Sequence, residues 1–204
     1  PISASNQPHI FEKQQFDLPD TYIFEDEELS LEEGLAHFHT DGLIILHEGK
    51  MLHEEYWNGN NKDSKHISFS VAKSYLSALF GIAVNEGLID SIEDNVSKYL
   101  EDFAGTGYED VKIKNLLQMS SGIEFNEDYA DPNSDINKFS RATARDVPFR
   151  DFAKTLKNGR PQGTYNHYVS LDTQVLAMIL ESVTDMPVRE YLYKRIWNKI
   201  GAES

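Results

Sequence analysis

Residues 67–86 read ISFSVAKSYLSALFGIAVNE and contain the most informative pattern in the chain. The tetrad Ser70-Val71-Ala72-Lys73 begins a helix that is apolar nearly all round, which predicts a buried central helix over residues 70–86. A lysine three residues after a serine lies on the same face of a helix, where its amine can reach the serine Oγ. The free N–H groups and the positive dipole at a helix start favour negative charge there. Ser70 is therefore a candidate nucleophile and Lys73 a candidate base.

The tetrad alone is weak evidence, because about one Ser-x-x-Lys is expected by chance in a chain of this size. A serine at a helix start is ordinarily an N-cap, and a lysine is ordinarily a solvated surface residue. Lys73, however, is flanked by Val71, Ala72 and Leu76 on a helix with little polar surface. A buried ammonium is costly unless it is paired or gives up its proton, and a neutral lysine is a base.

A second pattern, Tyr168-Val169-Ser170, stands just before another apolar helix. There a tyrosine can lie opposite the serine and lysine and pass a proton to a leaving group. The same Tyr-x-[Ser/Asn] spelling occurs at Tyr56 and Tyr75, and spacing alone does not rank the three. Their locations differ, because Tyr56 ends a predicted strand and Tyr75 lies inside the helix that begins at Ser70.

Composition limits the classes of function. The 204 residues are 40% hydrophobic, which is enough for one sizeable core, and no cysteine is present to form a disulfide or a thiolate metal site. The 34 acidic and 19 basic residues give a formal net charge of −15, which disfavours nucleic-acid binding. No stretch approaches the roughly 20 apolar residues of a membrane-spanning helix.

The remaining pattern predicts an irregular arm over residues 1–28, then a helix, a β-hairpin, a mainly helical region and a long polar loop or lid over residues 124–150. The predicted helices cover residues 29–38, 70–86, 111–119, 151–156, 171–183 and 188–200, and the hairpin strands cover residues 42–47 and 51–57.

Four ordered motifs resemble those of the serine β-lactamase and penicillin-binding superfamily, in its class C-like branch. The similarity is closest to the subgroup of amidases and esterases that contains 6-aminohexanoate-dimer hydrolase. The motifs are Ile67 to Ser74 with the apolar helix after it, Leu116 to Ile123 (LLQMSSGI), Phe125 to Pro132, and Pro161 to Leu176.

The resemblance implies an α+β fold of the β-lactamase/transpeptidase type, with an antiparallel sheet flanked by helices and a mostly helical region. It implies that Ser70 is the acylated nucleophile, that Lys73 is its base, and that Tyr168 relays the proton. Tyr129 would bind substrate from a loop that closes over it, with no metal and no cofactor. Tyr165 is an alternative relay. Ser170 stands where class C enzymes usually carry asparagine, which favours an amidase or esterase.

The resemblance also predicts the organisation of the chain. Residues 1–66 would form the arm, helix and hairpin of an α/β part, and residues 67–204 the helical part. The family's returning strands, one of which carries Lys-Thr-Gly or His-x-Gly, do not follow Ile200. We therefore expect the N-terminal part of a longer protein, or a second chain that completes the sheet. The expected partner is a small amide or ester substrate.

Three alternatives remain open. A β-lactamase or a D-Ala-D-Ala carboxypeptidase would use the same three residues, and a penicillin-binding homologue without catalysis would retain them for binding. His37-x-His39-x-Asp41 resembles the ligand motif of metal-dependent hydrolases, but Gly42 stands where a further histidine is expected. Surface histidines are the favoured interpretation of that motif.

Overall fold

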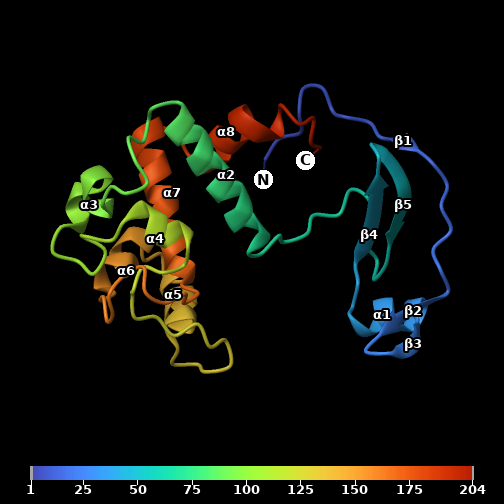
Figure 1. The fold of residues 1–204 in the computed structure, drawn as a ribbon, viewed down its shortest axis with the longest axis horizontal. Helices are drawn as coiled ribbons and strands as arrows, with labels where there is room; N and C mark the ends of the chain where they lie inside the picture. Colours follow the sequence, from blue (N-terminus) through green and yellow to red (C-terminus); the bar gives the residue numbers. More distant parts are fainter. Residues whose placement is uncertain (1, 204) are drawn as a thin grey trace. The chain divides into compact units, whose positions relative to one another are not determined.

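The computed structural model describes residues 2–203, which divide into two compact units. A helical unit comprises residues 2–8 and 69–203, and a strand-rich unit comprises His9–Ser68. Figure 1 shows the order of their elements along the chain. No helix among the described residues combines the length and the apolar character needed to cross a membrane.

The described residues of the helical unit form seven α-helices and two short helical turns. They are α2 (Val71–Asn85), α3 (Val96–Tyr99), the 3-10 turn η1 (Glu101–Phe103), α4 (Ile113–Leu117), α5 (Asp135–Thr143), α6 (Phe149–Thr155), α7 (Ser170–Thr184), α8 (Val188–Leu192) and the π-helical turn η2 (Tyr193–Trp197).

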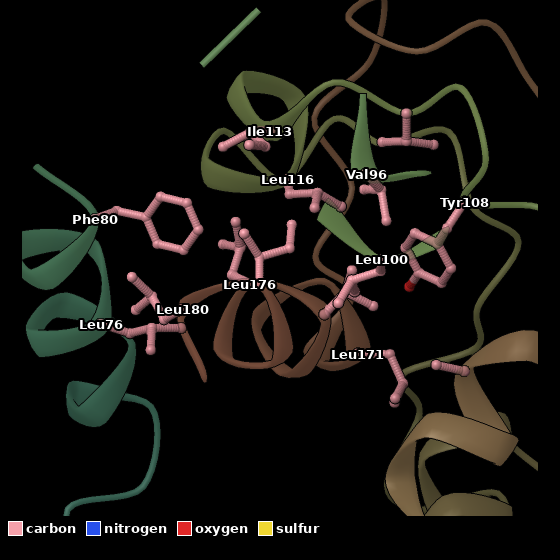
Figure 2. Close-up of a cluster of buried hydrophobic side chains, with 14 of the residues drawn as sticks. Leu76, Phe80, Val96, Leu100, Tyr108, Ile113, Leu116, Leu171, Leu176 and Leu180 are labelled. Atoms are coloured by element: carbon pink, nitrogen blue, oxygen red, sulfur yellow. The ribbon is translucent and has the colours of Figure 1, made fainter. Parts of the chain in front are cut away.

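Helix α7 lies at the centre of this unit's core. Its Leu176 and Leu180 pack in the same buried cluster as Leu76 and Phe80 of α2, as Figure 2 shows. Residues of α3, α4 and the turn at Tyr108 cover the other side of α7. Each fully buried aliphatic side chain contributes about 1.5–3 kcal/mol, so this cluster holds the middle of α2 against α7.

The two ends of the chain meet within the helical unit. The amide of Ser5 donates to the carbonyl of Ala202 at 2.8 Å, and the Ser5 hydroxyl donates to the carbonyl of Asn198 at 3.0 Å. Figure 1 shows the first and last described residues near α8. The first residues are therefore part of the helical unit, although they precede the strands in the sequence.

The strand-rich unit, between His9 and Ser68, contains two small sheets and one helix. In the first sheet the order is β1-β5-β4, with β1 (Glu12–Lys13) parallel to β5 (Lys50–Tyr56) and β4 (Gly42–His47) antiparallel to it. In the second sheet β2 (Thr21–Phe24) pairs antiparallel with β3 (Glu27–Ser30), and α1 (Leu31–His37) follows directly.

Both hairpins turn through two residues that have positive φ. These residues are Glu48 and Gly49 between β4 and β5, and Glu25 and Asp26 between β2 and β3. Two consecutive left-handed residues match the twist of antiparallel strands. The predicted hairpin is therefore present, whereas the arm predicted over residues 1–28 also contains β1 and β2.

Two further predictions differ from the structure. Residues 124–150 are not one long loop, because α5 begins at Asp135, where the Ser134 hydroxyl accepts a hydrogen bond from Asn137 N at 3.3 Å. Helix α2 is not buried all round, because it packs on α7 and α8 with one face only and leaves Val71 60% exposed.

Candidate active site

Ser70 stands immediately before the first residue of α2, and its hydroxyl is exposed. Its side chain makes no capping hydrogen bond to the helix, so the ordinary N-cap role is not the one that it plays here. The preceding residue, Phe69, has a φ of 44°. A left-handed conformation is strained for a bulky residue, and such strain concentrates at functional sites.

Two side chains converge on the Ser70 oxygen. The Tyr168 hydroxyl donates to Ser70 Oγ at 2.7 Å, and Lys73 Nζ lies 3.4 Å from the same oxygen. Lys73 Nζ also lies 5.3 Å from the centre of the Tyr168 ring. The structure thus brings together the three residues that the sequence nominates, although Ser70 and Tyr168 lie 98 positions apart.

Tyr168 is held by an irregular segment that is tied to the turn after α4. His167 N donates to Met119 O at 2.7 Å, and Gly163 N donates to Ser120 O at 2.8 Å. At the other end of the turn, Gly122 O accepts from Gly159 N at 3.0 Å. The LLQMSSG motif therefore positions both ends of the 159–167 segment, which stops one residue before Tyr168.

Glu127 joins the acidic loop to the start of α7, and it lies within the Phe125–Pro132 motif, from which only Tyr129 is predicted as a site residue. Its carboxylate accepts from the Ser170 hydroxyl at 2.5 Å, from Ser170 N at 3.0 Å and from the Tyr129 hydroxyl at 3.0 Å. The Ser170 side chain is therefore committed to Glu127 and does not bond to Ser70. The only signal in the sequence was that Glu127 stands two residues before Tyr129.

Tyr129 is 68% exposed on this loop. The pKa of Tyr129 is raised above its usual value. The largest cause is partial loss of hydration around its hydroxyl, and the next is the hydrogen bond to Glu127; the nearby Tyr168 acts in the same direction. Tyr129 is therefore a neutral hydroxyl near Tyr168, suited to contact a bound molecule.

The other tyrosines do not reach Ser70 through a described hydrogen bond. Tyr165 is exposed, and the guanidinium carbon of Arg160 lies 4.8 Å from the centre of the Tyr165 ring. The Tyr56 hydroxyl donates to Glu54 at 3.0 Å, and Tyr75 packs against Trp197 with ring centres 5.9 Å apart. Of the candidates that spacing leaves open, Tyr168 is the one with a described hydrogen bond to Ser70.

In the part of the chain that the structure describes, His37, His39 and Asp41 do not gather into a group of side chains that could hold a metal ion. Asp41 instead faces His66 at 2.9 Å. Within residues 2–203, no group of three or more histidine, cysteine, aspartate or glutamate side chains is arranged to hold a metal ion.

Comparison with known proteins shows that residues 30–204 match the Beta-lactamase family. The 6-aminohexanoate-dimer hydrolase of Paenarthrobacter ureafaciens is 33% identical over 180 residues, which cover 85% of this chain and 45% of that protein. A protein of Escherichia coli K12 named "Putative D-alanyl-D-alanine carboxypeptidase" is 23% identical over 182 residues, covering 78% of this chain and 41% of that protein.

Solved structures share the fold. "Putative 6-aminohexanoate-dimer hydrolase from Bacillus anthracis" aligns with a TM-score of 0.88 and 24% identity over 98% of this chain and 55% of that one. The class C β-lactamase of Rhodobacter sphaeroides aligns with a TM-score of 0.59 and 16% identity over 85% of this chain and 48% of that one. The chain spans about half the length of these relatives.

Proposed function

We propose that this chain, which belongs to the Beta-lactamase family, carries the nucleophile of a serine hydrolase that cleaves an amide or ester bond through an acyl-Ser70 intermediate. The proposal rests on the 2.7 Å contact between Tyr168 Oη and Ser70 Oγ, with Lys73 Nζ 3.4 Å from the same Oγ. A nucleophilic hydroxyl needs a neighbouring group that takes its proton, and both neighbours are of that kind.

The first half of the reaction makes the acyl-enzyme. Ser70 Oγ attacks the substrate carbonyl carbon and passes its proton to the Lys73–Tyr168 pair, in which the Lys73 amine takes up the proton and becomes the ammonium while Tyr168 keeps its hydroxyl. The oxyanion that forms is stabilised at the start of α2 by the N–H groups of Ser70 and Val71, for which the structure describes no hydrogen-bond partner. The N–H groups of Ala72 and Lys73, in contrast, donate to Phe69 O and Ser70 O. The carbon–nitrogen or carbon–oxygen bond then breaks, and Tyr168 returns the proton to the leaving group. The ammonium of Lys73 stabilises negative charge that develops on the Tyr168 oxygen.

The second half regenerates the serine. A water molecule attacks the acyl carbon and gives its proton to the same pair, and the ester bond to Ser70 Oγ breaks with return of a proton to Oγ. Each half-reaction therefore uses the same proton route in opposite directions.

An amidase or esterase of the 6-aminohexanoate-dimer hydrolase type is the favoured subclass. The support is the 33% identity to that hydrolase and the presence of serine at position 170. Tyr129, on the loop that Glu127 ties to α7, is the proposed substrate-binding residue.

The test is intact-mass spectrometry of the full-length protein after treatment with a fluorophosphonate, followed by peptide mapping. We expect one adduct on Ser70, turnover of a p-nitrophenyl ester, and loss of both in Ser70→Ala. Ser77→Ala is the matched control, because Ser77 is exposed on the same helix. Tyr168→Phe should lower kcat by about 10²–10⁴-fold.

The remaining outcomes separate the alternatives. A penicillin adduct that forms on Ser70 and is not turned over would instead support a penicillin-binding homologue, and release of D-alanine from a D-Ala-D-Ala peptide would support a carboxypeptidase. Full activity in Ser70→Ala would overturn the assignment of the nucleophile.

A further inference from the structure

A buried carboxylic acid lies at the start of α7, four residues after Tyr168. Asp172 is 0% exposed and occupies the first turn of the helix. Carboxylates are almost never fully buried unless they are paired, because loss of hydration penalises the charged form. No cation pairs with Asp172 in the described chain, so its presence in the core needs a reason other than stability.

The neighbours of Asp172 are hydroxyl groups. The Tyr108 hydroxyl donates to Asp172 Oδ1 at 3.0 Å, and Figure 2 shows this hydroxyl directed toward the start of α7, near Leu171. Oδ2 has no hydrogen-bond partner among residues 2–203. The hydroxyl of the nearby Ser121 nevertheless lowers the pKa of Asp172, as the Tyr108 hydroxyl does.

The electrostatics of the site leave Asp172 able to change its charge near neutral pH. Burial raises the pKa of Asp172 to about 7, the hydroxyls of Ser121 and Tyr108 lower it, and the charge of Glu127 on the acidic loop raises it. Burial also holds the pKa of Tyr108 well above its usual value, so Tyr108 remains a donor. Tyr108 and Glu127 are the titratable groups that act on Asp172.

Both hydroxyl partners belong to elements that position Tyr168. Ser121 lies in the turn that accepts hydrogen bonds from the 159–167 segment. Tyr108 lies in the loop whose Asp110 carbonyl accepts from Gln162 Nε2 of the same segment at 2.7 Å. Asp172 itself lies on the helix that follows Tyr168. A single carboxyl group thus connects the turn, the loop and the helix start around the residue that contacts Ser70.

We propose that Asp172 is a positioning residue, which in its ionised form holds the start of α7 against the Ser121 turn and Tyr108 and thereby keeps Tyr168 in contact with Ser70. This inference rests on the proposed function. Hydrogen bonds to a carboxylate are about twice as strong as those to a neutral group, and the positive end of the α7 dipole favours the charge. Protonation weakens these bonds and loosens Tyr168, so activity falls as the pH falls through the Asp172 titration.

The test compares kcat and KM for a p-nitrophenyl ester between pH 5.5 and 9 in the full-length protein. Wild type should show a step in kcat near pH 7, of about tenfold, with KM unchanged because Asp172 cannot touch substrate. Asp172→Asn, which cannot ionise, should lack the step and give the low-pH value of kcat throughout. Asp185→Asn is the matched control, because Asp185 is exposed at the other end of α7 and should leave the profile unchanged.

Tyr108→Phe separates Asp172 from any other titrating group. It removes a donor that favours the carboxylate, so the step should move to higher pH while Asp172 is still present. The ¹³C shift of the Asp172 carboxyl, identified by its loss in Asp172→Asn, should titrate at the pH of the kinetic step. The inference about Asp172 is overturned if the step in kcat persists in Asp172→Asn or stays at the same pH in Tyr108→Phe. Acylation of Ser70 in the same experiments would still support the proposed function. If Ser70 is never acylated, both fail.

Discussion

At the scale of single residues, the hydrogen bonds of His66 favour its charged form. Its Nε2 lies 2.9 Å from Asp41 Oδ2, and its Nδ1 lies 3.1 Å from the carbonyl oxygen of Ile67. Both partners are acceptors only, and a neutral imidazole has a single N–H, so only the imidazolium makes both bonds. The carboxylate of Asp41 raises the pKa of His66, and Asn58 and His66 lower that of Asp41.

We therefore expect the His66 ring to titrate above its usual pKa of about 6.5. A histidine whose pKa is raised by folding contributes stability that is fully present below 6.5 and is lost as the pH rises through the folded-state value. The measurement is the pH dependence of the imidazole ¹H and ¹⁵N shifts, with His66→Gln used to assign the resonance. Asp41→Asn should lower the midpoint, and a wild-type midpoint at or below 6.5 would contradict the assigned charge.

The sequence predicted which residues carry the proposed chemistry better than it predicted which residues hold them. Ser70 and Lys73 follow from a spacing that has a chemical reason, and Tyr168 follows from the family resemblance, because spacing alone does not rank it above Tyr56 and Tyr75. Asp172 was missed because it lies among Leu171, Val175 and Leu176, where the apolar pattern indicates only a core helix. A carboxylate at a core position of that pattern was the signal, because burial of an unpaired charge is costly.

At the scale of elements, the turn after α4 depends on one glycine. Gly122 has a φ of +78°, and a Cβ atom there would overlap the backbone oxygen of Arg160. Because that oxygen belongs to the backbone, it cannot move without displacing the 159–167 segment that leads to Tyr168. The turn is therefore both a folding element and a support for the site.

Gly122→Ala should lower the free energy of unfolding by at least about 2 kcal/mol and should lower kcat as well. Gly87→Ala is the matched control, because Gly87 has a φ of +72° and nothing within 4 Å of the added Cβ. Gly87→Ala should lower the free energy of unfolding by about 1 kcal/mol, through backbone strain alone, and should leave kcat unchanged. Urea unfolding and ester hydrolysis measure the two effects. Equal costs at both positions would show that the contact with Arg160 relaxes and that the turn does not position Tyr168.

Long apolar elements were predictable and short polar ones were not. Helices α2 and α7 were predicted within two residues of their bounds, because their periodic pattern extends over about four turns. Helix α5 was missed because its exposed face and acidic surroundings resemble a loop, and its cap at Ser134 was overlooked. Strands β1 to β3 are two to four residues long, too short for an alternating pattern to identify them.

At the scale of the whole molecule, the prediction of a β-lactamase/transpeptidase-like α+β fold is confirmed by the family match over residues 30–204 and by the shared fold of the solved relatives. The fold could be predicted because four motifs follow one another along the chain in the order typical of the family, and together they identify the fold more specifically than any one motif does. The buried core was harder to foresee. Among the described residues, every fully buried hydrophobic side chain lies at Leu76 or beyond, and none lies within residues 9–68.

This distribution predicts unequal protection from hydrogen exchange in the 204-residue chain. Backbone amides exchange through local opening, and the free energy of opening depends on the buried apolar contacts that are broken. Amides in the middle of α7 lie in the core and should exchange at the rate of global unfolding of the helical unit. Those of β4 and β5 pair across a sheet whose Ile44 and Leu46 side chains are each 49% exposed, so they should exchange much faster.

Hydrogen–deuterium exchange with mass spectrometry of peptic peptides tests this difference. Peptides from α1 serve as an internal control, because that helix has no buried residue and should exchange as fast as the strands. Equal protection of α7 and the β4–β5 hairpin would contradict the expectation and would mean that the strand-rich unit gains its stability from contacts other than a buried apolar core. If the amides of the hairpin exchanged slowly and those of α1 exchanged fast, the stabilising contacts would lie within the sheet that contains β4 and β5.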